Sequence, residues 1–302
     1  MVSFASKAKR VTMNFLMYIL FVILKTIVPL FPLRFIRKIC RLKGRLFYYI
    51  LPVRKNTAIN NLKLAFPEKN EKEIKKIVKS CYINILTVIA EFFYMNKLDK
   101  KSLAGLINME NPELIKEKLK QGNGLILISG HFGNWELTAY GAAKLCNTPF
   151  NVVIKEQTNK KVNEEINKIR SEAGNKLIDM RNSLREILTV LKNNGVVAML
   201  GDQAAPKENV KINFFVKDVP AFEGTAKIAI KTGAAVLFGV SVRNPDGTYN
   251  VKLHEIDTSK YSDASEENIK NLTQEHADLL ADYIRQGPDH WLWFHRRFKN
   301  VG

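Results

Sequence analysis

Short apolar runs alternate with helical stretches from residue 125 to residue 242, and this alternation restricts the chain to an α/β fold. Continuous apolar runs of four to nine residues are typical of buried strands in a sheet that helices cover on both faces. The predicted strands are 125–129, 151–154, 176–178, 196–200, 234–242 and 249–253. The predicted helices among and after them are 134–145, 160–173, 183–192, 225–231 and 265–286. We therefore predict an α/β core over about residues 122–299, with a mainly helical region before it.

The first 67 residues are strongly basic. The chain carries 47 Lys and Arg against 29 Asp and Glu, a net charge of +18, and 13 of its basic residues precede Glu68, the first acid. Charge alone would suit a nucleic-acid-binding protein, but long apolar stretches separate the basic residues and no nucleic-acid-binding motif is present. We expect a membrane surface containing anionic lipid as the partner, and no nucleic acid.

An apolar run from Phe15 to Leu24 lies inside this basic region. A spanning helix needs about 20 apolar residues, so the run is short for one. A cleaved signal peptide, a single spanning helix, an interfacial or re-entrant anchor and a soluble buried helix all stay open. We assign residues 1–50 to a hydrophobic and basic membrane anchor and residues 51–302 to a second, catalytic domain.

The three cysteines, Cys40, Cys81 and Cys146, lie far apart in the sequence. Their spacing fits neither a disulfide framework nor a Cys/His zinc site. We expect three unreactive thiols, and neither a metal nor a cofactor.

The motif G-H-F-G-N-W-E, residues 130–136, joins the strand 125–129 to the next helix. Functional side chains gather at the carboxyl ends of strands in such sheets, which places His131 at a candidate site. Asn134 is a predicted N-cap, and Glu136 follows in the first helical turn, where it could face His131. A carboxylate against one imidazole nitrogen raises the basicity of the other, so the pair would form a general base without a protein nucleophile. A capped helix with a buried histidine and an exposed glutamate is the competing interpretation.

The motif resembles the H-x-x-x-x-[DE] box of glycerolipid and lysophospholipid acyltransferases, and its full form is most similar to the bacterial lipid A late acyltransferases. Further similarities follow in order along the chain. They are G-N-K-L-I-D at 174–179 with Arg170 upstream, L-G-D-Q at 200–203, the block 222–234, and the closing G-P-D-H-W-L-W-F-H-R-R-F-K at 287–299.

The resemblance implies a glycerolipid-acyltransferase-like central mixed sheet flanked by helices, on the cytoplasmic face of the cytoplasmic membrane. It implies transfer of a fatty acyl chain from acyl carrier protein, or less often CoA, to a hydroxyl of a lipid. His131 would be the general base, Glu136 its orienting partner, Arg170 a ligand of the thioester or the developing oxyanion, and Asp202 an acid in the cleft. Expected substrate-binding residues are Asn134, Gln203, His295, Arg296 and Arg297.

Several functions fit the same residues. A lipid A precursor is the first candidate acceptor, and another glycolipid or a lysophospholipid is the alternative. A thioesterase or lipase could use the same histidine and carboxylate to activate water. A catalytically idle membrane-binding module is the third hypothesis, and the intact set of charged residues argues against it.

Overall fold

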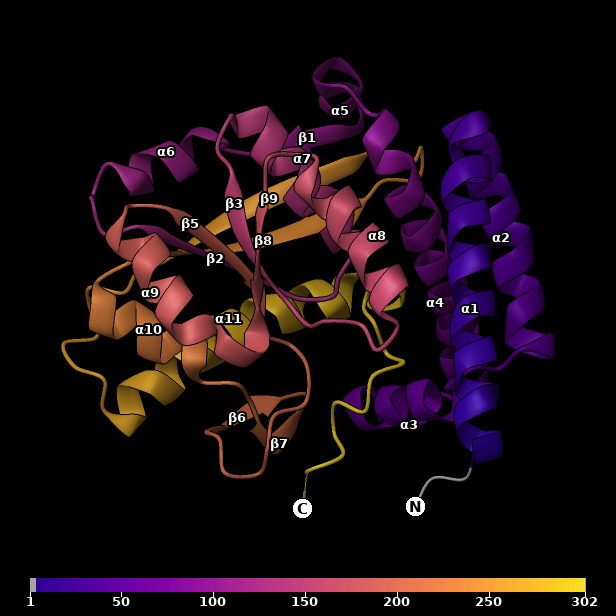
Figure 1. Ribbon diagram of the computed structural model, residues 1–302. Helices are drawn as coiled ribbons and strands as arrows, with labels where there is room; N and C mark the ends of the chain where they lie inside the picture. Colours follow the sequence, from indigo (N-terminus) through magenta and orange to yellow (C-terminus); the bar gives the residue numbers. More distant parts are fainter. Residues whose placement is uncertain (1–3, 302) are drawn as a thin grey trace.

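A mixed seven-stranded sheet forms the centre of the protein (Figure 1). The computed structural model describes residues 4–301, and the side chains of residues 11–301 except that of Asn182. The strand order is β1-β9-β8-β2-β5-β3-β4, and only the β8–β9 pair is antiparallel. The strands are β1 (Ile107–Met109), β2 (Leu125–Ser129), β3 (Phe150–Ile154), β4 (Lys176–Asp179), β5 (Val196–Leu200), β8 (Ala235–Arg243) and β9 (Tyr249–Ile256).

Helices cover both faces of this sheet, which confirms the predicted fold class. Ile126 and Ile128 of β2 point to one face, where they pack with α9 (Ser183–Lys192), α10 (Gly224–Thr232) and α11 (Glu266–Gln286). Leu125 and Leu127 point to the other face, against α6 (Glu113–Leu119) and α7 (Trp135–Cys146). This period-two alternation explains why the strand is apolar throughout.

The remaining elements extend this core. Helix α5 (Lys100–Leu106) precedes β1, α8 (Lys160–Ser171) precedes β4, and a small antiparallel hairpin pairs β6 (Lys211–Phe214) with β7 (Val216–Pro220). The sequence analysis did not predict β1, α5 or this hairpin. Strand β1 has only three residues, and β6 alternates exposed with buried positions, so neither forms a continuous apolar run.

Four helices make up the N-terminal region: α1 (Phe4–Ile27), α2 (Leu33–Ile50), α3 (Lys55–Ala65) and α4 (Glu71–Tyr94). Helix α2 packs closely along α4, because a Cβ on Gly44 would lie only 2.7 Å from the Cα of Ile83. Within the described residues, two helical stretches are long and apolar enough to cross a membrane, Val11–Leu30 and Glu71–Lys97. The second is more than half buried in the protein, whereas none of the first is buried.

The three cysteine side chains are buried and free. Burial raises the pKa of the Cys40 thiol to about 11, which disfavours the reactive thiolate.

Candidate active site

The loop from Gly130 to Asn134 places His131 just beyond the carboxyl end of β2. Gly133 has a φ of +63°, and a Cβ at this position would lie 1.9 Å from the carbonyl oxygen of Ser241. Only glycine fits this close approach. The turn then leads into α7, whose first turn carries Glu136, as predicted from the sequence.

Asp202 is the carboxylate that contacts His131. The two strands that precede these residues are neighbours in the sheet, with Ser129 of β2 paired to Leu200 of β5. His131 Nδ1 lies 2.7 Å from Asp202 Oδ1, and the backbone N–H of His131 donates to Asp202 Oδ2 at 2.8 Å. The indole N–H of Trp291 donates to the same Oδ2 at 2.7 Å. Asp202 is thus fixed by three donors.

This arrangement sets the tautomer and the charge of the imidazole. An ionised carboxylate can only accept, so Nδ1 carries the proton and Nε2 keeps its lone pair. Burial alone would raise the pKa of Asp202, but the His131 and Trp291 contacts outweigh it and hold that pKa at about 2. Burial would lower the pKa of His131, yet the Asp202 charge and hydrogen bond raise it above its usual value. His131 Nε2 lies 3.3 Å from Gln203 Nε2, which can donate to it.

Glu136 pairs with Arg170 instead of His131. Arg170, in the last turn of α8, donates from Nε to Glu136 Oε2 at 2.9 Å and from Nη2 to Oε1. This corrects the expectation that Glu136 orients the imidazole. The five-residue separation brings Glu136 near His131, but the planar guanidinium matches the carboxylate with two hydrogen bonds. Two of the five guanidinium N–H groups are used, and the other three have no acceptor among the described residues.

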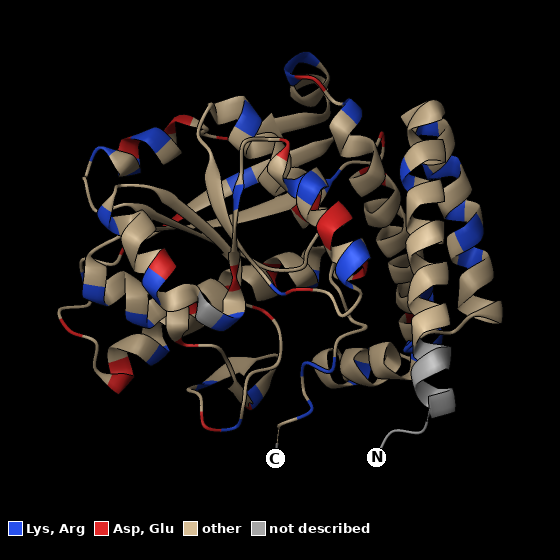
Figure 2. Cartoon of the chain, in the orientation of Figure 1, with Lys and Arg blue, Asp and Glu red and all other residues tan. Residues whose placement is uncertain are grey.

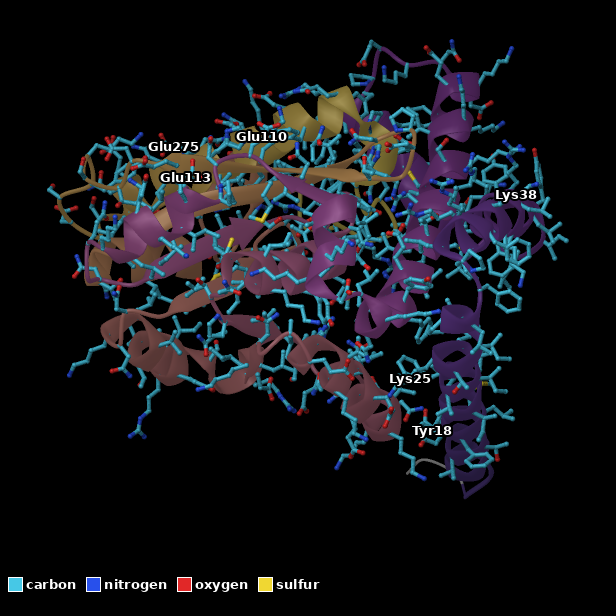
Figure 3. All side chains as sticks on the ribbon, turned by 90° about the horizontal axis from the view of Figure 1, so that it is seen from above. Tyr18, Lys25, Lys38, Glu110, Glu113 and Glu275 are labelled. Carbon is cyan, nitrogen blue, oxygen red and sulfur yellow. The ribbon has the colours of Figure 1, made fainter. Side chains whose placement is uncertain are left out.

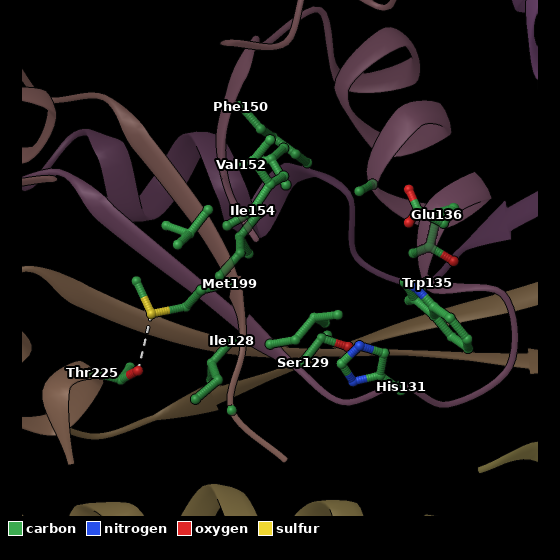
Figure 4. A pocket seen from close by; sticks show the side chains of 18 of the residues that line it. Ile128, Ser129, His131, Trp135, Glu136, Phe150, Val152, Ile154, Met199 and Thr225 are labelled. Carbon is green, nitrogen blue, oxygen red and sulfur yellow. Dashed lines mark hydrogen bonds between the residues drawn. The ribbon is translucent and has the colours of Figure 1, made fainter. Parts of the chain in front are cut away.

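A cavity of about 790 Å³ opens beside these side chains. Its polar wall includes His131, Glu136, Arg170 and Gln203. In the view of Figure 4, His131, Trp135 and Glu136 lie on one side of the cavity and apolar side chains on the other. The apolar lining comes from several strands and helices and includes Leu127, Ala142, Phe150, Val152, Ile154 and Met199. A long hydrocarbon chain next to a reacting polar group would suit this cavity.

Comparison with known proteins identifies the family. The sequence model described as bacterial lipid A biosynthesis acyltransferase matches residues 4–300. The chain belongs to this family. The resemblance inferred from the motifs is thereby confirmed, and the chain is an O-acyltransferase.

Curated relatives of this acyltransferase are named for lipid A biosynthesis or as phosphatidylinositol mannoside acyltransferases. Lipid A biosynthesis lauroyltransferase of Escherichia coli K12 is 25% identical over 263 residues, covering 85% of this chain and 82% of that protein. The palmitoleoyltransferase of the same organism is 25% identical over 256 residues, covering 82% and 79%. A phosphatidylinositol mannoside acyltransferase of Mycolicibacterium smegmatis is 23% identical over 206 residues, covering 67% and 65%.

Asn134 has a structural role in the acyltransferase, not the predicted role in substrate binding. Its side chain is buried, with Oδ1 accepting from the backbone N–H of Leu137 at 3.0 Å and Nδ2 donating to Glu91 at 2.6 Å. Both polar atoms are used inside the protein, so the expectation of substrate contact is corrected. Asn134 is the N-cap of α7.

The three basic residues of the closing motif, His295, Arg296 and Arg297, lie in three different environments. His295 lines the cavity, and burial lowers its pKa. Arg296 is exposed and not part of the cavity wall. Arg297 is buried, donates to the carbonyl oxygen of Pro220 at 2.7 Å and lies over the Phe214 ring, so it is not available to a substrate phosphate as predicted. Burial lowers its pKa to about 10.

The sequence analysis missed two contributors to the site, Trp291 and Glu91. Trp291 belongs to the closing motif, but its bond to Asp202 joins residues 89 positions apart. Glu91, buried in α4, accepts from Asn134, from the Tyr249 hydroxyl and from Arg37 Nε of α2. A single acid inside an apolar helical stretch is the only sequence signal for Glu91.

We expect Arg170→Lys to lower the rate of transfer about a hundredfold, the effect typical of losing a donor to a developing oxyanion. Lysine keeps the charge but cannot hold Glu136 through two bonds and still present planar N–H groups to a carbonyl. Turnover of the purified enzyme with saturating donor and acceptor is the measurement. Arg285→Lys is the matched control, because Arg285 forms an exposed pair with Asp282. Full activity of Arg170→Lys would show that Arg170 contributes only its positive charge.

Proposed function

We propose that this enzyme transfers a fatty acyl chain from a thioester of acyl carrier protein, or of CoA, to a hydroxyl group of a lipid A precursor. The observation that carries the proposal is His131 at the wall of a largely apolar cavity. Asp202 holds Nδ1, and the Nε2 lone pair, 3.3 Å from the Gln203 amide nitrogen, can serve as the base. Among the described residues, no serine, threonine or cysteine side chain is hydrogen-bonded to the imidazole. The attacking hydroxyl therefore belongs to the acceptor.

In the proposed reaction, His131 Nε2 takes the proton of the acceptor hydroxyl as its oxygen attacks the thioester carbonyl carbon. The carbonyl π electrons move to the oxygen, and Arg170 N–H groups stabilise the oxyanion. The C–S bond then breaks as the carbonyl re-forms, and the imidazolium returns the proton to the leaving thiolate. Asp202 stabilises the imidazolium between these steps. The products are the acyl ester and the free thiol of the carrier.

The surroundings of the cavity suit the proposed substrates. Its apolar walls would take the hydrocarbon of the acyl chain. His295, Lys155 and Lys299 line the polar part, where they can meet phosphate or carboxylate groups of the donor or acceptor. Gln203 would orient the hydroxyl or the imidazole, and Arg296 stays a candidate for substrate contact. We place the enzyme at the cytoplasmic membrane with residues 51–302 on the cytoplasmic face, where carrier-bound thioesters are made, and residues 1–50 as its anchor.

Another glycolipid is the second candidate acceptor, because relatives of the chain are named as phosphatidylinositol mannoside acyltransferases. Both candidates need the same base, cavity and donor. They differ in the structure of the acceptor.

The test is an assay of the purified full-length chain in mixed lipid–detergent micelles. Acyl carrier protein and CoA thioesters are each combined with a lipid A precursor, a phosphatidylinositol mannoside, a lysophospholipid or no acceptor. We expect thiol release that equals the amount of acylated glycolipid found by mass spectrometry, with the lipid A precursor used fastest. Release of free fatty acid at the same rate without any acceptor would instead indicate a hydrolase.

A further inference from the structure

Two apolar stripes on α1 and α2 face away from the rest of the protein. Both helices lie at the same edge of the molecule (Figure 1), where α1 contacts α8 and α4, and α2 packs along α4. We call these stripes the outer face. On α1 they are Leu16, Ile19, Leu20, Ile23 and Ile27, and on α2 Phe35, Leu42, Leu46 and Tyr49. Each of these side chains is at least 39% exposed, so the outer face needs a partner.

The opposite side of α1 is held against the protein by polar contacts. Asn159 Nδ2 donates to the carbonyl oxygen of Asn14 at 2.7 Å, and the Lys25 ammonium lies 2.6 Å from Glu165. Between them, Lys161 lies over the Tyr18 ring and Phe21 packs edge-on against Phe93 of α4. The α1 residues are spaced by four, three and four positions, so they form one face of the helix. Figure 3 shows Tyr18 and Lys25 on this helix.

These contacts are incompatible with a helix that crosses a bilayer. They extend from Asn14 to Lys25, about 16 Å along the axis, whereas the hydrocarbon core is about 30 Å thick. Their partners on α8 are a charged segment, K-K-V-N-E-E-I-N-K-I-R-S. If α1 stood across the membrane in this arrangement, Lys161, Glu165 and Lys168 would lie in hydrocarbon, where charged groups are costly.

The charges on α2 fit an anionic lipid surface. Arg34, Lys38, Arg41 and Arg45 are exposed, and their spacing puts them on one side of the helix beside its apolar stripe. Figure 2 shows basic segments along α2 in blue. None of the four forms an ion pair with a described residue. An amphipathic helix with basic residues beside an apolar stripe is typical of segments that lie in the plane of the interface.

We propose that α1 and α2 attach the enzyme to a single leaflet of an anionic bilayer, with α1 lying along the surface and only the outer face embedded. The chain then does not cross the membrane, and its N-terminus stays on the same side as the active site. Helix α8 joins α1 to the site, because it carries both Glu165 and Arg170. Attachment therefore holds the cavity at a fixed distance from the lipid surface.

Membrane sidedness tests this proposal without relying on activity. The full-length chain carries a protease-cleavable tag at each end and is expressed in a bacterium from which right-side-out and inverted inner-membrane vesicles are prepared. We expect protease to remove both tags from inverted vesicles and neither from intact right-side-out vesicles. Cleavage of the two tags from opposite sides, or absence of the protein from floated vesicles, would overturn the proposal.

Cross-linking tests the position of α1 in the membrane. The variant with Lys25→Cys and Glu165→Cys is treated in vesicles with a short bis-maleimide. The matched control combines Ile23→Cys, on the outer face, with Glu165→Cys. We expect efficient cross-linking in the first variant and at least tenfold less in the second, since the native cysteines are buried. Equal or absent cross-linking in both would show that α1 leaves α8 in the membrane. Neither result depends on the acyl acceptor, so failure here is separate from failure of the proposed reaction.

Discussion

Asp202→Asn should lower the rate of acyl transfer by about three orders of magnitude, within the usual range for loss of general-base catalysis. The reason lies in the donors around the carboxylate. Oδ2 accepts from the His131 backbone N–H and from the Trp291 indole, so an asparagine must place its oxygen there. Its NH₂ group then faces His131 Nδ1, which must become the acceptor. The imidazole proton moves to Nε2, and the base is lost although the histidine is present.

The rate–pH profile separates this effect from a loss of structure. In the natural enzyme, the rate should rise with pH through the pKa of His131, because only the neutral imidazole accepts a proton. Asp202 raises that pKa, so the Asn variant should have the midpoint of its rate–pH profile at a lower pH than the natural enzyme. The rate that it reaches at high pH should be much lower. Asp282→Asn, at an exposed ion pair, is the matched control. A plateau within twofold of the natural enzyme would mean that Asp202 does not set the tautomer.

His131→Ala should reduce transfer by about a hundredfold to ten-thousandfold while the protein stays folded. Among the described histidines, His131 is the one whose ring is hydrogen-bonded to Asp202, through Nδ1, and the other cavity histidine, His295, has its own pKa lowered by burial. Turnover with an acyl carrier protein thioester is measured beside circular dichroism and donor binding. We expect donor binding to change little, because the apolar walls are intact.

Two outcomes would contradict this assignment. Turnover close to the natural value would place the base elsewhere. An equal loss of donor affinity and of rate would make His131 a binding residue. His290→Ala is a useful second variant, because the His290 ring stacks on that of Phe132, next to His131 in the chain, and is not part of the cavity wall.

The order of strands and helices could be predicted from residue patterns because each element buries its own apolar stripe. The runs around Leu125 and Val196 are apolar on both faces, and no solvent-facing alternation competes with the strand assignment. The sequence also placed His131 after a strand and Glu136 in a helical first turn. The short β1 and the β6–β7 hairpin were not predicted, because β1 has only three residues and β6 alternates exposed with buried positions.

The sequence by itself determined most of the core strands and helices, the position of His131 after β2 and the apolar, basic character of the first 50 residues. The tertiary structure alone decided which charges meet. Asp202, 71 residues from His131, reaches it because parallel pairing brings the ends of β2 and β5 together. Glu136 instead accepts hydrogen bonds from Arg170 of α8. Local spacing limits the distance between two side chains, but a carboxylate bonds to the donor that the packing brings into the better geometry.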